Sequence, residues 1–202
     1  MSATSPPSWA EKMLRLLLSP EDRDIVSGDM LELYRTRSHR SSADSRRRDL
    51  WYIGELARLL WVQNRAWIAL LSLSLLARTA VDRLAPTNEF HARAIWSTLA
   101  GIGTILSAGF VAGYRTSSVT AAAICGATTA VLAAAFHTIG TAVLLAIWHG
   151  PDTWSAIEQS GGLSEAFTLP MLLFIPGISL GSVAGGVAAV LKRARRIGAG
   201  SI

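Results

Sequence analysis

Few side chains in this sequence of 202 residues have the types and the spacing that catalysis or metal binding requires. Its four histidines, its one cysteine (Cys125) and its acidic residues do not fall at the short intervals that metal ligands keep. Gly101 and Gly103 are not followed by the lysine of a phosphate-binding loop. No serine is expected in a nucleophile elbow, the sharp strand-to-helix turn of many hydrolases. The sequence therefore predicts a protein that is not an enzyme, with no catalytic residue, no metal site and no cofactor.

His137 is the one polar side chain whose surroundings indicate a candidate site. It lies within residues 119–148, a stretch without a charged side chain. Three- and four-residue spacing places it on one helix face with small residues, which mark the side of a membrane helix that packs against other helices. The imidazole is therefore expected to point into a helix bundle, on the same face as Gly126, Ala130, Ala133 and Gly140.

Pro176 offers His137 a candidate partner. Proline cannot donate a backbone hydrogen bond, so a helix that contains Pro176 would leave the carbonyl of Leu172 free. Counted from the outer helix ends at about 1.5 Å per residue, His137 lies about 16 Å deep and Pro176 about 13 Å deep. The alternatives are a hydrogen bond to the Ala133 carbonyl or to Thr141, and a proton relay, for which the spans at 95–114, 119–148 and 167–191 supply no acidic partner.

The elements that must position these residues are membrane helices. About 20 apolar residues cross the hydrocarbon core of a bilayer, and residues 119–148 exceed that length. Residues 95–114 and 167–191 are also long and apolar. Residues 66–84 form the weakest span because they carry Arg78, and a helix lying on the membrane surface is the competing interpretation. Both ends of the chain are basic and favour the cytoplasm, which requires an even number of crossings and therefore includes residues 66–84.

The predicted architecture is all-α. A small cytoplasmic helical head (1–64) precedes a four-helix transmembrane bundle (65–191) and a basic cytoplasmic tail (192–202). Glycines at four-residue spacing form faces on which helices approach closely, either within the chain or with a second copy in a homo-oligomer. These helix-packing positions are Gly109, Gly113, Gly177, Gly181 and Gly185.

The head is expected to hold three helices. The first covers residues 9–18, and Ser8 and Glu11 have the spacing of a capping box at its start. The second covers residues 20–36, and a polar linker at 37–45 precedes the third. The apolar side of the second helix is formed by Ile25, Val26, Met30, Leu33 and Tyr34.

Basic residues point to the lipid surface as a partner. Arg46, Arg47 and Arg48 fall in the first turn of the third helix, where the helix dipole disfavours cations, so anionic lipid head groups are the candidate that would hold them. The alternative is a solvated charge run. Lys192 and Arg193 in the tail are expected to contact lipid in the same way. Nucleic acid is not an expected partner, because the head has few exposed aromatic residues and no recognisable reading helix.

Residues 6–61 resemble the permease prefix domain, the N-terminal module of bacterial ABC permeases of the macrolide-export type. The matching residues are Pro6-Pro7, LLLSPEDRD at 16–24, GDMLELY at 28–34 and RRRDLWY at 46–52. In that family a long permease with a large extracytoplasmic domain follows, which this chain lacks, so the transport activity is not carried over. The resemblance implies a bacterial inner-membrane protein with a cytoplasmic helical head.

These features predict a non-enzymatic, multi-pass protein of the bacterial inner membrane, with both termini in the cytoplasm. Its head is expected to make it an accessory or regulatory partner of a transporter or of a cytoplasmic protein. The alternative is a small transporter or channel that acts through the helix bundle. A carrier places paired ionisable groups inside its bundle, and the sequence offers His137 and little else there.

Overall fold

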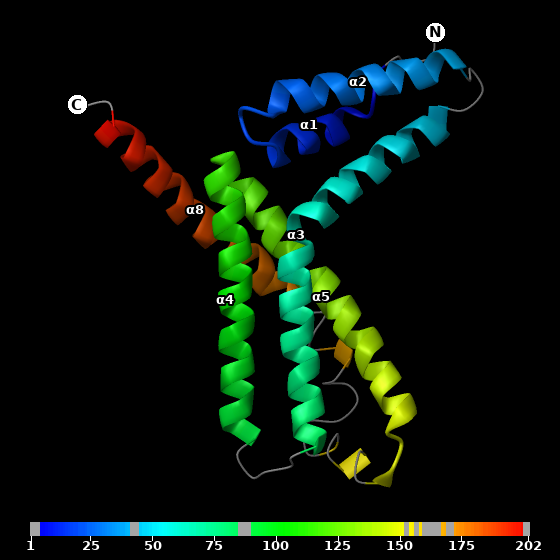
Figure 1. Ribbon diagram of the computed structural model, residues 1–202, viewed down its shortest axis with the longest axis vertical. Coiled ribbons are helices and arrows are strands. Elements are labelled where there is room, and N and C mark those ends of the chain that lie inside the picture. The colour runs from blue at the N-terminus through cyan, green and yellow to red at the C-terminus, as the bar shows by residue number, and fades with distance from the viewer. Residues whose placement is uncertain are drawn as a thin grey trace.

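Helices make up most of the chain that the computed structural model describes, which is residues 5–40, 45–84, 90–151, 154–155, 158, 167–168 and 172–199. These residues contain no strand, and the all-α prediction is confirmed. Figure 1 shows their six main helices: α1 (Ser8–Leu17), α2 (Arg23–Arg40), α3 (Ser45–Leu84), α4 (Phe90–Thr116), α5 (Val119–Ile147) and α8 (Phe174–Ala199).

Four of the described helices are long and apolar enough to cross a membrane. The candidate spans are Arg46–Asp82, Ala92–Thr116, Val119–Ile147 and Phe174–Arg195. Large apolar side chains stand outward along all four, and Leu73, Trp96, Ile139 and Val190 are among the most exposed. A surface of this kind is unfavourable in water and suits a lipid environment. The chain therefore has the architecture of a multi-pass membrane protein.

The long helices alternate in direction. In Figure 1, α1, α2 and the C-terminal end of α8 lie at the same end of the bundle, which is termed the head end. The α4–α5 turn lies there too and takes only Ser117 and Ser118. Ser117 has a φ of 57° and ends α4, while the Ser118 hydroxyl caps α5 by accepting a hydrogen bond from the Ala121 amide at 3.2 Å.

Helix α3 joins the head to the bundle without interruption. The predicted domain boundary between residues 64 and 65 falls inside this helix of 40 residues, and the predicted span 66–84 is its second half. Figure 1 shows the helix change direction part-way along its length. Its first half packs against α1 and α2, and its second half packs against α4 and α5. Helices α1 and α2 and residues 45–64 of α3 together form the head.

Arg78 takes part in an ion-pair cluster near the end of α3. Its Nε lies 3.5 Å from one carboxylate oxygen of Asp82, whose other oxygen lies 3.4 Å from Nη1 of Arg93 in α4. The Arg78 Nη1 also donates to the Ser97 hydroxyl at 3.4 Å. A charge in a membrane helix costs less when it is paired, so the cluster explains how α3 accommodates Arg78 and joins α3 to α4.

Glycines bring α4, α5 and α8 into close contact. A Cβ atom on Gly109 would lie 2.7 Å from the Cα of Gly181, and one on Gly113 would lie 2.6 Å from the Cα of Gly185. A Cβ atom on Gly177 would lie 2.8 Å from an alanine Cβ of α5. These approaches need glycine, because a side chain would hold the backbones apart. All five of these glycines lie at crossings between helices of one chain.

The start of α1 differs from the predicted capping box. The helix begins directly after Pro7, and no side chain caps its first turn. Glu11 does not reach back to Ser8 but forms an ion pair with Arg15 at 3.1 Å. This pair lies one helical turn apart on an exposed surface, where such contacts contribute about 0.5 kcal/mol or less.

Other helix bounds also differ from the predictions. Helix α2 runs from Arg23 to Arg40 and so extends into the predicted polar linker, of which residues 41–44 lie outside the described residues. Helix α4 begins at Phe90, five residues before the predicted span. Helix α8 covers Phe174–Ala199 rather than residues 167–191, and residues 169–171 lie outside the described part.

Candidate functional site

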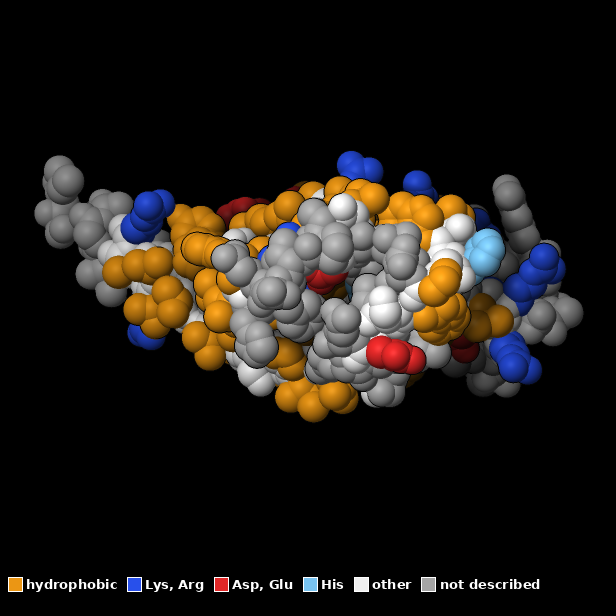
Figure 2. Space-filling model, turned by 90° about the horizontal axis from the view of Figure 1, so that it is seen from below, with side chains coloured by type: hydrophobic (Ala, Val, Ile, Leu, Met, Phe, Trp, Pro, Cys, Tyr) orange, Lys and Arg blue, Asp and Glu red, His pale blue; other side chains and the backbone are white. Residues whose placement is uncertain are grey.

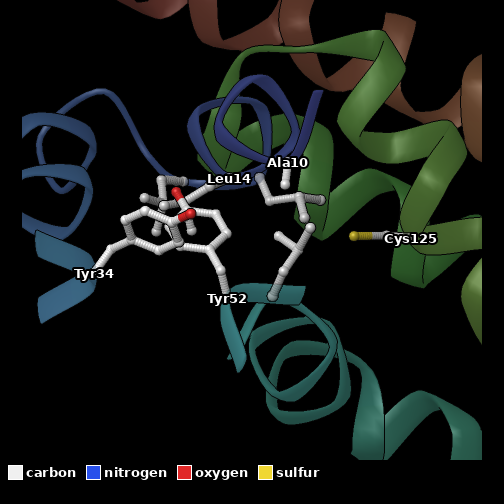
Figure 3. Packing of buried hydrophobic residues seen from close by; sticks show 8 residues of the cluster. Ala10, Leu14, Tyr34, Tyr52 and Cys125 are labelled. Atoms are coloured by element: carbon white, nitrogen blue, oxygen red, sulfur yellow. The ribbon is translucent and has the colours of Figure 1, made fainter. Parts of the chain in front are cut away.

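One apolar cluster packs the head onto the bundle. Figure 3 shows Leu14 of α1 close to the rings of Tyr34 and Tyr52, and Ala10 of α1 between those rings and Cys125 of α5. Each of these five side chains is buried. Helix α1 also contacts α4 and α5 directly. The core of the head is therefore continuous with the core of the bundle.

Tyr34 connects α2 to α3. Its hydroxyl donates a hydrogen bond of 2.6 Å to Oδ1 of Asp49, and its ring meets Tyr52 edge-on with the centroids 6.0 Å apart. Burial, followed by the hydrogen bond and the charge of Asp49, raises the pKa of Tyr34 to about 12. The phenol therefore remains a neutral donor throughout the physiological pH range.

Arg48 is part of this packing and not of the lipid-facing surface. It is 7% exposed, and its guanidinium lies 5.7 Å from the centroid of the Tyr34 ring. The predicted contact of Arg48 with lipid head groups is therefore contradicted by its burial. Its neighbours Arg46 and Arg47 are exposed, as the prediction for those two residues requires.

The basic residues of α8 lie beside the end of α4. Lys192 Nζ donates to the backbone carbonyl of Arg115 at 3.2 Å, and Arg195 Nη1 donates to the hydroxyl of Tyr114 at 3.1 Å. Arg193, one position after Lys192 in α8, is exposed. The head end of the bundle thus carries cations from both the head and the tail.

The outer surface of α2 displays two large apolar side chains. Ile25 and Leu33 are 67% and 51% exposed, and their spacing of eight residues puts them on one helix face. Asp29 lies midway between them and Glu32 lies beside them, and both are exposed. Ile25, Asp29, Glu32 and Leu33 are together termed the α2 face.

The prediction that Ile25 and Leu33 pack inward is wrong. The inward side of α2 is filled by a four-residue stripe that begins at Val26, continues through Met30 and ends at Tyr34. Ile25 and Leu33 precede members of that stripe by one position, which turns them away from the head core. The acidic residue at position 29, midway between them, is the sequence signal that distinguishes the outer stripe from the inner one.

His137 is buried within the bundle. It is 7% exposed, and its Nε2 lies 3.5 Å from the Thr141 hydroxyl, one of the partners considered from the sequence. Its Nδ1 has no hydrogen-bond partner among the described residues. Pro176 is the third residue of α8, where an unbonded backbone nitrogen is normal, so it does not kink the helix. No hydrogen bond joins His137 to Leu172 in the part of the chain that the structure describes.

A polar cluster between α3 and α5 was not anticipated by the sequence analysis. Asn64 Nδ2 donates to the Leu60 carbonyl at 2.8 Å and lies 3.7 Å from Cys125 Sγ. Its Oδ1 accepts a hydrogen bond from the Thr129 hydroxyl at 3.3 Å. Asn64 and Thr129 are both buried, so this contact fixes α3 on α5 where the head meets the bundle. An asparagine two residues before the predicted span 66–84 is the signal, because lipid disfavours an unpaired amide.

The described residues offer little of what catalysis requires. They contain no group of three His, Cys, Asp or Glu side chains that could hold a metal ion. Gly177, Ser179 and Gly181 have the spacing of a nucleophile elbow, but all three lie inside α8. The Ser179 hydroxyl donates to the Ile175 carbonyl one turn earlier, at 3.2 Å. The α2 face and the basic residues at the head end can bind other molecules, and this binding is the chemistry that the described side chains support.

No protein-family model, curated protein or solved structure matches the chain. The resemblance of residues 6–61 to a permease prefix domain therefore rests on the sequence segments quoted for it.

Proposed function

We propose that this chain is a non-enzymatic protein of the bacterial inner membrane that docks a transporter or a cytoplasmic protein on its helical head. The observation that carries the proposal is the α2 face, where two large apolar side chains stand exposed among acidic ones. In Figure 1, α2 lies farther from the bundle than α1 does, so this face is open to a partner.

The composition of the α2 face fits a protein partner. Exposed apolar side chains with polar neighbours mark interaction surfaces, because covering them removes apolar area from water. Asp29 and Glu32 add negative charge at the edge of the apolar contact. Charge complementarity then favours a partner whose own apolar contact has a basic rim.

The way in which the head is mounted supports an accessory role. The apolar cluster of the head, which includes Leu14 and Tyr52, extends to Cys125 of α5. Asn64 of α3 also accepts a hydrogen bond from Thr129 of α5. A partner bound to α2 is thereby held in a defined orientation at the end of the bundle. This arrangement suits an accessory subunit that positions or regulates a transporter.

The cytoplasmic location rests on charge and on the family resemblance. Exposed basic residues of the head and of the tail lie at one end of the bundle, and such residues concentrate on the cytoplasmic side of membrane proteins. The similarity of residues 6–61 to a bacterial permease module points in the same direction.

Co-purification from a mild detergent tests the proposal. We expect the intact protein to retain a transporter or its ATPase in a stoichiometric amount. The double variant Ile25→Ser/Leu33→Ser should lose that partner, because it removes both apolar contacts without entering the head core. Leu50→Ser is the matched control, since Leu50 is 59% exposed on α3 and outside the α2 face. Equal retention by the double variant and the control would contradict the proposal.

Transport through the bundle is the second candidate function, and the burial of His137 favours it. Ionisable side chains inside a membrane bundle often belong to ion or substrate pathways. Substrate flux in proteoliposomes that contain this chain alone would support transport. His137→Leu should then abolish flux without unfolding the protein, whereas a packing role predicts lower stability with flux retained.

A further inference from the structure

An apolar groove opens on the outer side of the bundle between α3, α4 and α8. Its volume is about 450 Å³, which falls in the range of roughly 300–1,000 Å³ found for small-molecule sites. The groove faces the surroundings of the bundle, because side chains on its wall, such as Val183 and Val187, are more than half exposed. Its principal lining residues are Trp67, Leu106, Phe110, Val111, Val183 and Val187.

Two helix faces lead from this groove toward the head end. On α4, Phe110 is followed one turn later by Tyr114, and their rings stack with the centroids 6.2 Å apart. On α8, four-residue spacing leads from Val187 through Leu191 to Arg195. The two faces meet again where Arg195 Nη1 donates to the Tyr114 hydroxyl at 3.1 Å.

Two cations converge at this meeting point. Lys192 Nζ lies 5.8 Å from the centroid of the Tyr114 ring and donates to the carbonyl of Arg115 at 3.2 Å. A guanidinium has five N–H donors and an ammonium has three, so the bonds to Tyr114 and to the Arg115 carbonyl occupy only some of the donors of Arg195 and Lys192. Along the helix, Arg195 lies about 12 Å from Val187. The cationic cluster therefore lies about two helical turns from the apolar groove, along the same faces of α4 and α8.

We propose that the groove and this cluster bind one anionic phospholipid. Its phosphate would contact Arg195 and Lys192, and an acyl chain would lie along Phe110 and Val187 toward the interior of the bilayer. The phosphate gains charge-assisted hydrogen bonds from the two cations, and the acyl chain covers the aromatic and aliphatic wall of the groove. A second copy of the chain is the poorer occupant, because membrane helices pack through small residues and this groove is lined by Trp67 and Phe110.

Native mass spectrometry of the full-length protein tests the site. The protein in mild detergent is mixed with dioleoylphosphatidylglycerol or with dioleoylphosphatidylcholine, and the retained lipid molecules are counted. We expect one phosphatidylglycerol molecule to be retained in preference to phosphatidylcholine. Lys192→Gln and Arg195→Gln should each weaken that retention about fivefold. Arg35→Gln, which removes an exposed cation of α2 outside the cluster, should leave that retention unchanged.

Filling the groove gives an independent test. Val187→Trp places a large ring in the groove and should displace the lipid, and the 51% exposure of Val187 means that the substitution needs no space in the core. Val190→Trp is the matched control, because Val190 is 67% exposed on the same helix and does not line the groove. Equal retention of the two lipids, or equal effects of the two tryptophan variants, would overturn the proposal. A dimer that Val187→Trp disperses, with no lipid retained by the unaltered protein, would overturn it too and assign the groove to contact between copies.

Discussion

Tyr34 is the residue through which α2 is attached most directly to α3. Its 2.6 Å hydrogen bond ends on the Asp49 carboxylate, and its ring packs against Tyr52 and beneath Arg48. A hydrogen bond to a charged group contributes more than one between neutral groups, and its loss leaves the carboxylate partly buried without its donor. The Tyr34 hydroxyl thus adds a charge-assisted hydrogen bond to the apolar contacts of Val26 and Met30 that attach α2 to the rest of the head.

Removing the Tyr34 hydroxyl should loosen the head. We expect Tyr34→Phe to destabilise the docking of α2 by about 2 kcal/mol, because it retains the ring and deletes only the hydrogen bond. Limited proteolysis of the detergent-solubilised protein should then cleave the head faster while the bundle is cut at an unchanged rate. Thr36→Val is the control, since Thr36 is exposed and bonds only to the Glu32 carbonyl of its own helix. Equal cleavage rates for the two variants would contradict the assigned role.

The same residue predicts how the stability of the head depends on pH. The pKa of Tyr34 is raised in the folded state from the ordinary value of 10.0 to about 12, so folding favours the protonated phenol. Its contribution is therefore complete below pH 10 and is lost as the pH rises from about 10 through 12. Proteolysis of the unaltered head should accelerate across that interval, and Tyr34→Phe should remove this part of the pH dependence.

At the scale of the helix, local patterns predicted some elements closely and others poorly. Helix α5 occupies Val119–Ile147, against the predicted residues 119–148, because an uncharged run and the cap at Ser118 determine its extent locally. The continuity of α3 was not predicted, because polar residues such as Asn64 and Arg65 resemble a boundary between a soluble head and a span. The structure shows that the Asn64 side chain bonds to Thr129 of α5, so its amide is satisfied within a continuous helix.

The site residues were also predicted only in part, because spacing within one helix shows which residues share a face but not what that face contacts. Spacing identified the glycines of α4 and α8, since their faces follow from helix geometry alone. Spacing could not show that Arg48 is buried, because its partner Tyr34 comes from a different helix. Spacing alone also left open which of two adjacent stripes on α2, beginning at Ile25 or at Val26, faces the head core, and the acidic Asp29 in the first stripe is the signal that decides it.

The crossing of α8 with α4 and α5 gives a prediction at this scale. A Cβ atom on Gly181 would lie 2.7 Å from the Ala122 carbonyl oxygen, whereas one on Gly186 would have no neighbour within 4 Å. Gly181→Ala should therefore destabilise the bundle by about 2 kcal/mol through forced separation of the helices. Gly186→Ala should be neutral or should stabilise it by up to about 1 kcal/mol, because alanine favours the helix.

Thermal unfolding of the two variants in detergent measures this difference. Size-exclusion chromatography of the same samples should show the oligomeric state of the unaltered protein, because Gly181 contacts helices of its own chain. Equal melting temperatures for the two variants would contradict the crossing, and a change of oligomeric state in Gly181→Ala alone would assign the glycine face to a contact between copies.

At the scale of the whole molecule, charge and helix direction define two different ends. The head, the α4–α5 turn and the basic end of α8 lie together, and the ion pairs of Asp82 lie toward the other end of α3. Figure 2 views the molecule from that other end and shows hydrophobic side chains around its flanks, with the Lys and Arg side chains mainly at the periphery. An excess of cations at the head end predicts that the membrane orients this end toward the cytoplasm.

Cysteine accessibility in intact spheroplasts tests that orientation. Cys125 is buried and is first replaced by alanine, which leaves a background without thiols. A single cysteine is then introduced by Thr36→Cys in the head or by Glu158→Cys beyond the far end of α5, both at exposed positions. An impermeant thiol reagent should modify the cysteine at position 158 in intact cells, and the one at position 36 only after the membrane is permeabilised.

Both positions lie on the same chain, so each serves as the control for the other. Modification at position 36 alone would reverse the orientation and place the α2 face outside the cytoplasm. Modification of both in intact cells would require an even number of crossings between them, against the three candidate spans that lie there.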